Sequence, residues 1–156
     1  AAARGRLATV RLKLLQNALL DGREAPAMET VFVGETLRSA LALEDAGIRE
    51  APTYPRGHLY RGHLRAAICA LEALGKEGSV GCATAGIDDL RNALRLSPMS
   101  ASMHAKVARY YIHAWSLFDA PARREALSVI ERASRMNPTD KALQQALETA
   151  RKEIRG

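Results

Sequence analysis

The first candidate site in the sequence is a group of basic side chains near the start of a predicted helix. His58, Arg61 and Arg65 are separated by three and four residues, so one face of a helix carries all three. Guanidinium groups bind carboxylates and phosphates through parallel hydrogen bonds. The spacing therefore predicts an anion-binding ridge. The alternative is a solvated polar face with no ligand.

A second candidate site combines aromatic side chains with an arginine. Tyr111 and Trp115 are four residues apart and share one face of a helix. Aromatic and arginine side chains contribute much of the binding energy at protein interfaces. We therefore expect a partner-binding groove that is formed by Arg109, Tyr111, Trp115 and Phe118. The alternative is that these aromatic rings belong to the core, because large rings favour burial.

Patterns typical of metal-dependent or nucleophilic catalysis do not occur in the sequence. The histidines are at positions 58, 63, 104 and 113 and form no His-Glu-x-x-His motif. The glycine-rich segment 75–81 lacks the Gly-Lys-Ser/Thr ending of a phosphate-binding loop, so it predicts a turn. No arrangement of nucleophile, base and orienting acid can be placed. We expect no catalytic residue, no metal site, no cofactor and no enzymatic activity.

The two cysteines, Cys69 and Cys82, are too few for a disulfide framework. They fall on successive predicted helices and can approach each other across a hairpin. The sequence favours a role as small buried residues. Whether they pair stays open, and so does the redox compartment.

Composition favours a single all-α domain. The chain has 156 residues, of which 47% are hydrophobic and only 4% aromatic, and its abundant Ala, Leu and Arg are strong helix formers. No apolar run reaches the roughly 20 residues that a membrane-spanning helix needs. The chain begins at Ala1 without Met, which makes a removed signal or membrane anchor a reasonable expectation.

Apolar residues recur at helical spacing in seven segments, and prolines and glycines separate these segments. The predicted helices cover residues 3–20, 28–48, 56–75, 79–96, 100–118, 121–136 and 140–154. Two of them end alike. Leu90 and Ala93 precede Pro98 in the same way as Ile130 and Ala133 precede Pro138, forty residues later. Self-similarity at a fixed period is typical of helical repeat proteins.

This pattern resembles the tetratricopeptide repeat, in which two antiparallel helices share small and large packing residues and a proline follows the second helix. The best match covers residues 107–140, and a poorer one covers 67–100. The matching residues of the first are Tyr110, Ala114, Leu117, Ala126, Ile130, Ala133 and Pro138. The period of forty departs from the roughly 34 residues of that family. The resemblance implies a binding platform and no catalytic residue.

We therefore expect antiparallel helical hairpins stacked as a short tetratricopeptide-like α-solenoid, with residues 1–156 forming one domain. A weak unit at 4–52 precedes units at about 56–98 and 99–138, and a helix at 139–155 caps the stack. Stacking is expected because each hairpin has apolar residues on more than one face. The first helix of each pair is expected to line the inner surface.

The leading functional prediction is a non-catalytic scaffold or adaptor that binds a protein or peptide. Small tetratricopeptide-like accessory proteins of bacterial envelope-polysaccharide systems are similar in size and composition, so an accessory factor of a membrane or envelope assembly system is one setting. The alternative is a basic helical module for nucleic acid or another polyanion, because the net charge is +6. The sequence predicts neither the compartment nor the oligomeric state.

Overall fold

The computed structural model describes residues 27–73 and 79–156, and it is all-helical over these ranges. The α-helices are α2 (Ala27–Glu50), α3 (Pro55–Glu72), α4 (Ile87–Leu96), α5 (Ala101–His113), α6 (Ala120–Met136) and α7 (Lys141–Arg155), with 3-10 helices η1 (Ser79–Thr84) and η2 (Trp115–Leu117). The all-α prediction is confirmed. The helix expected at 3–20 lies outside the described residues.

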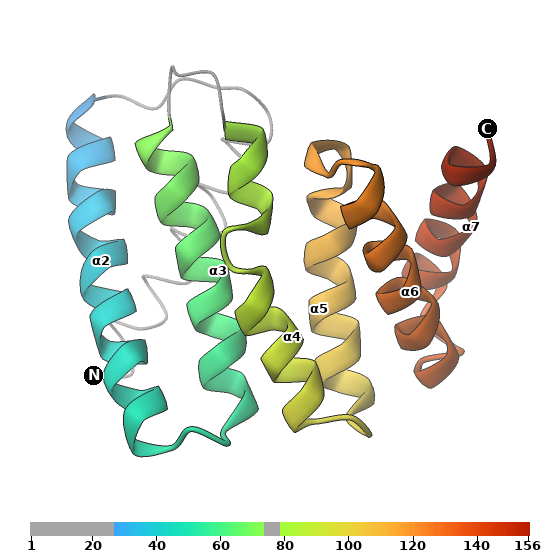
Figure 1. Cartoon of the computed structure of the whole chain (residues 1–156), viewed down its shortest axis with the longest axis horizontal. Coiled ribbons are helices and arrows are strands. Elements are labelled where there is room, and N and C mark those ends of the chain that lie inside the picture. Colours follow the sequence, from blue (N-terminus) through green and yellow to red (C-terminus); the bar gives the residue numbers. More distant parts are fainter. Residues whose placement is uncertain (1–26, 74–78) are drawn as a thin grey trace.

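The helices follow one another along the long axis of the molecule, with α2 at one end and α7 at the other (Figure 1). α2 packs on α3, and α3 packs on α4 and η1. α5 packs on α6, which in turn packs on α7. α5 also contacts α4, so it joins the two halves of this row. Among the described residues, no helix is both long enough and apolar enough to cross a membrane.

Polar caps define where the later helices begin. The side chains of Ser100, Asp119 and Asp140 accept hydrogen bonds from backbone N–H groups in the first turns of α5, α6 and α7. Such caps satisfy donors that the helix itself leaves unpaired. The Asn137 side chain, at the end of α6, donates 3.0 Å to the carbonyl of Ala101 and so ties that turn to the start of α5.

The predicted helix over 79–96 is wrong as a single element, because the chain changes direction between η1 and α4. Gly86 lies at this break and touches Gly62 of α3. A Cβ atom added to Gly86 would lie 1.9 Å from the carbonyl oxygen of Gly62. The backbones of α3 and the start of α4 therefore meet directly, which only glycine permits at this position.

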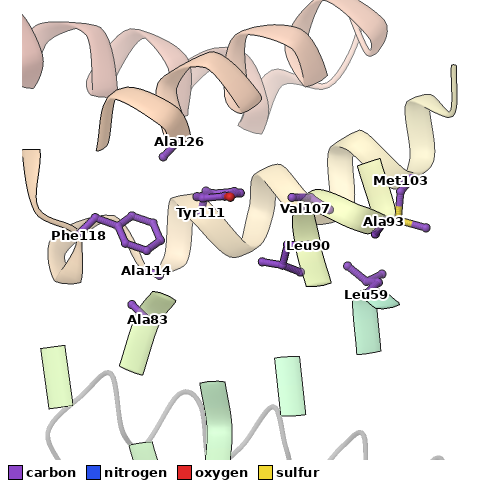
Figure 2. Close-up of a cluster of buried hydrophobic side chains, with 10 residues drawn as sticks. All are labelled: Leu59, Ala83, Leu90, Ala93, Met103, Val107, Tyr111, Ala114, Phe118 and Ala126. Carbon is purple, nitrogen blue, oxygen red and sulfur yellow. The ribbon is translucent and has the colours of Figure 1, made fainter. Parts of the chain in front are cut away.

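Two hydrophobic clusters share α5. On one side, Val107 and Tyr111 pack with Leu90 and Ala93 of α4 and with Leu59 of α3 (Figure 2). On the other side, α5 contributes to a cluster with α6 and α7, whose members are Ala105, Ala108, Ile130, Ala133, Leu143 and Leu147. A helix with apolar contacts on two faces has to be covered by neighbours on both.

The residues that define the sequence repeat occupy equivalent buried positions. Leu90 and Ala93 are both 0% exposed, and Ile130 and Ala133 are 1% and 0% exposed. In each helix the alanine allows a close approach to the neighbouring helix, and the large residue fills the space beside it. The similarity of the two segments therefore reflects the same packing role in α4 and α6.

Cys69 and Cys82 form a disulfide between α3 and η1. The expectation that they are simply small buried residues is wrong, and the pairing question is answered. Their sequence separation is 13 residues, and a crosslink over a loop of this size stabilises a fold by roughly 3 kcal/mol. The bond ties η1 to α3, just before the chain changes direction at Gly86.

Candidate functional site

The three side chains of the predicted anion-binding ridge lie on α3 and meet a carboxylate of the same chain. Asp89 of α4 is 1% exposed. Arg61 donates to Asp89 Oδ1 from Nε at 3.0 Å and from Nη2 at 2.7 Å. Arg65 Nη1 donates to Asp89 Oδ2 at 2.8 Å. Both carboxylate oxygens are thus held by guanidinium groups, as a buried charge requires.

The same network reaches α2 and the segment before α3. Arg61 Nη1 donates to Asp45 of α2 at 3.1 Å, and its hydrogen bonds to Asp89 raise the pKa of its guanidinium above its usual value. The buried His58 donates from Nε2 to the carbonyl of Pro52 at 2.8 Å, which leaves Nδ1 at 3.9 Å from Asp89 Oδ1. The network therefore joins α2, α3 and α4.

Asp89 is the residue that the sequence alone did not identify as part of this site. It stands beside Asp88, and neighbouring positions on a helix point in different directions. Asp88 is exposed and pairs with Arg91 at 2.8 Å, whereas Asp89 points into the protein. The only indication in the sequence was the position of Asp89, which lies four residues before Ala93 and so shares the buried face of α4.

The aromatic residues predicted to line a partner-binding groove do not converge on one surface. Tyr111 and Phe118 are 1% and 4% exposed, and their ring centroids are 5.5 Å apart in the core (Figure 2). The prediction that they contact a partner is wrong. The physical reason is that α5 ends at His113, and η2 then turns Phe118 back onto Tyr111.

The other two residues of that predicted groove connect the end of the chain to α5 and η2. The half-buried Trp115 donates from its indole nitrogen to Glu153 of α7. The Arg123 guanidinium lies 5.8 Å from the centre of the Trp115 ring, a cation–π distance. The exposed Arg109 donates to Asp140 at 2.8 Å. The Trp115–Glu153 and Arg109–Asp140 contacts help to hold α7 and its cap against η2 and α5.

A histidine and a tyrosine link α3, α5 and η1 in a way that the sequence did not indicate. His63 stacks on Tyr110 with ring centroids 5.2 Å apart, and Tyr110 Oη donates to the carbonyl of Ala83 at 2.6 Å. Burial lowers the pKa of His63 to about 4 and raises the pKa of Tyr110 to about 12. Both side chains are therefore neutral at pH 7 and act as packing groups.

An ion pair joins α4 to α6. Arg91 donates to both carboxylate oxygens of Glu125, at 2.7 and 2.6 Å. These hydrogen bonds lower the pKa of the Glu125 carboxyl and raise the pKa of Arg91. Two parallel bonds fix the relative orientation of the two groups, and this partly exposed pair links α6 to α4 at the surface.

A groove of about 360 Å³ lies between α4 and α6. Its apolar lining consists of Leu94, Pro98 and Val129, and its polar lining consists of Arg95, His104, Ser128 and Arg132. It is formed by α4 with the turn that follows it, by the first turn of α5 and by α6. The sequence predicted a groove on the first helices and missed this one, because a space between two helices depends on their distance apart.

Arg95 and Arg132 are exposed, and His104 is 2% exposed. The described residues contain no group of three or more His, Cys, Asp or Glu side chains that could hold a metal ion. The groove can therefore offer apolar contact and two positive charges to a ligand.

Comparisons of the chain with protein-family models, curated proteins and solved structures find no significant match.

Proposed function

We propose that this chain is a non-catalytic scaffold that binds a protein partner, built as a short tetratricopeptide-like stack of helical hairpins. The observation that carries the proposal is the equivalence of two successive hairpins, α3–α4 and α5–α6. Leu90 with Ala93, and Ile130 with Ala133, are buried at corresponding positions of the second helices. Repeated hairpins of this kind expose extended surfaces, which such proteins use for binding.

The ion-pair networks support the same proposal because they make the surface rigid. The buried Asp89 fixes α4 against α3, and the more exposed Arg91–Glu125 pair adds a contact between α4 and α6. A surface that is already ordered loses little conformational entropy when it binds a partner. The helix α7 completes the stack, with Leu143, Leu147 and Ala150 buried and the opposite face exposed, as suits a terminal helix.

The second candidate function is binding of nucleic acid or another polyanion. The observation that favours it is a set of exposed arginines on α4 and α6, which are Arg95, Arg124, Arg132 and Arg135. The ridge first expected to bind an anion contributes less to this candidate. Arg61 and Arg65 already bind Asp89, and an external phosphate would have to displace that carboxylate.

The disulfide bears on where the scaffold acts. Disulfides form and persist mainly in secreted, periplasmic and other oxidising environments. The Cys69–Cys82 bond therefore favours a role as an accessory factor of a membrane or envelope assembly system over a role in a reducing compartment.

Site-specific photo-crosslinking in the native cell tests the proposed function. A photoreactive amino acid replaces one exposed residue at a time, at Tyr60 on α3, Ser128 on α6 and Glu148 on α7. The proposal predicts a discrete adduct from at least one position that protease removes and nuclease does not. Adducts that nuclease removes support the polyanion candidate instead, and the absence of an adduct at every position contradicts both.

A further inference from the structure

We propose that the groove between α4 and α6 binds a segment of the partner protein in which an apolar side chain lies next to a carboxylate. This inference rests on the proposed scaffold function and names the chemistry that the scaffold recognises. The groove combines an apolar lining, from Leu94, Pro98 and Val129, with two arginines and a histidine. Each of these three features constrains the ligand separately.

The charge of the groove is not balanced by the protein itself. Six arginines of the described chain lie within 3.2 Å of an acidic side chain. They are Arg38, Arg61, Arg65, Arg91, Arg109 and Arg151. Arg95 and Arg132, like Arg135 and several others, have no ion pair within residues 27–73 and 79–156, but these two lie together in the groove lining. Because both line the groove, they form a site for an external carboxylate.

Arg132 is held in place beside the groove. Its Nη2 donates to the carbonyl of Pro98 at 3.0 Å, so this contact links α6 to the turn after α4. That bond uses one of five N–H donors of the guanidinium, and the others are available to a ligand. The side chain is thus oriented before any ligand binds, which lowers the entropic cost of binding.

His104 also lines the groove, and most of its side chain is buried. Its Nδ1 donates to the carbonyl of Ser100 at 2.9 Å, since a carbonyl can only accept. The only hydrogen bond of the ring within the described part of the chain is that of Nδ1, and the other ring nitrogen, Nε2, is not among the fully buried atoms that lack a partner. In the neutral ring Nε2 is an acceptor. A backbone N–H of a bound peptide segment matches it.

The apolar part of the lining defines the rest of the ligand. Leu94 and Val129 are half-buried and extend the core cluster to the surface. They face the space between the helices together with Pro98. An apolar side chain of the partner gains burial there, while its neighbouring carboxylate reaches Arg95 and Arg132.

The same lining argues against nucleic acid as the occupant. Single strands bind where aromatic rings stack on the bases, and no Phe, Tyr or Trp lines this groove. The volume of about 360 Å³ lies at the small end of the roughly 300–1,000 Å³ that is usual for ligand pockets. One or two side chains of a peptide suit this space better than a run of nucleotides.

Titration of the full chain with short peptides, followed by amide chemical shifts in NMR spectra, tests the proposal. The probe is the blocked peptide Gly-Asp-Leu-Asp-Gly. One control, Gly-Asn-Leu-Asn-Gly, lacks the carboxylates, and a second, Gly-Asp-Gly-Asp-Gly, lacks the apolar side chain. The proposal predicts that the probe shifts the amides around Leu94 and Val129 at millimolar concentration. Each control should bind about tenfold more weakly, because charge-assisted bonds and apolar burial contribute comparably.

Two matched variants locate the binding site. The double variant Arg95→Gln/Arg132→Gln should weaken binding of the probe by about tenfold or more. Arg135→Gln removes one positive charge, as each substitution of the double variant does, from an exposed position of α6 outside the groove, and it should leave the affinity within about twofold. Unchanged circular dichroism and thermal unfolding of the double variant exclude a folding defect as the cause.

The results separate the groove from the scaffold function. No shift at the groove up to millimolar peptide, or an equal effect of Arg135→Gln, overturns the groove proposal. Selective shifts of the groove amides by an oligothymidine ten-mer overturn it in favour of a polyanion. If crosslinks from Tyr60 or Glu148 persist in these cases, the scaffold proposal stands and only its assigned site is wrong.

Discussion

The Arg61 guanidinium donates two hydrogen bonds to one oxygen of the buried Asp89 carboxylate, at 3.0 and 2.7 Å. The first joins α3 to α4 through Nε and the second through Nη2. Arg65 Nη1 donates a hydrogen bond to the other carboxylate oxygen of Asp89 at 2.8 Å. A basic ridge that looks from the sequence like a site for an external anion therefore forms an internal contact between α3 and α4.

Removing the Asp89 charge should destabilise the fold strongly. Asp89→Asn leaves Arg61 largely buried without its main partner, and breaking a buried ion pair in this way costs about 3–5 kcal/mol. The neighbouring Asp88→Asn is the matched control, because Asp88 is exposed and surface pairs contribute roughly 0–1 kcal/mol. Urea unfolding of both variants measures the difference. Equal free energies of unfolding would show that Asp89 does not hold α3 and α4 together.

The contact between Gly62 and Gly86 should make substitution at Gly86 costly. In Gly86→Ala the new Cβ would meet backbone atoms of α3, so the helices have to separate, at a cost of about 3 kcal/mol or more. Gly47→Ala in α2 is the control, because nothing lies within 4 Å of its added Cβ. There alanine should stabilise the helix by up to about 1 kcal/mol. The account of this crossing fails if both alanine variants unfold at the same urea concentration.

His63 should make the stability depend on pH between 7 and 5. Burial lowers its pKa from 6.5 to about 4 in the folded state, so the unfolded chain binds the proton more readily in this range. The stability that neutral His63 provides is complete above pH 6.5 and is lost as the pH falls towards 4. The loss between pH 7 and pH 5 is about 2 kcal/mol.

Two histidine variants isolate this effect in urea unfolding at pH 7 and pH 5. His63→Phe preserves a ring against Tyr110 and should lose most of the pH dependence. His113→Gln, at an exposed position at the end of α5, should retain it. The interval stays above the range in which Glu125, whose pKa Arg91 lowers, becomes protonated. A pH dependence that is identical in the parent chain and in His63→Phe would contradict the assignment.

Loss of the disulfide should destabilise the side of the molecule formed by α3 and η1. Cys69→Ala/Cys82→Ala removes a crosslink across 13 residues, with an expected loss of roughly 3 kcal/mol. Reductant should lower the unfolding temperature of the parent chain to that of the variant and leave the variant unchanged. Thiol titration of the native, air-oxidised chain provides an independent check. Two reactive thiols per chain would contradict the pairing.

The positions of several helices could be predicted from the sequence, because the spacing of apolar residues along one segment determines whether it forms a helix. Helical periodicity placed α2, α6 and α7 within a few residues of their ends, since one apolar face recurs in each. The repeated pairs Leu90–Ala93 and Ile130–Ala133 predicted equivalent burial, which the structure has.

Properties that depend on two separate segments could not be predicted. The break before α4 exists because Gly86 meets Gly62 of another helix, and nothing within 79–96 indicates this. Tyr111 and Trp115 share a helical face, yet the turn at η2 places one in the core and the other beside α7. Periodicity identifies an apolar face without saying whether the chain itself or a partner covers it.

The salt dependence of binding to the crosslinked partner, once purified, tests the central claim most directly. A protein scaffold with an apolar groove should keep its affinity within about tenfold between roughly 50 and 200 mM salt. A module that neutralises several phosphates loses roughly 10³–10⁵ in affinity over that range. Isothermal titration of the full chain at several salt concentrations gives the slope. A shallow slope is the predicted result, and a steep one contradicts the scaffold proposal.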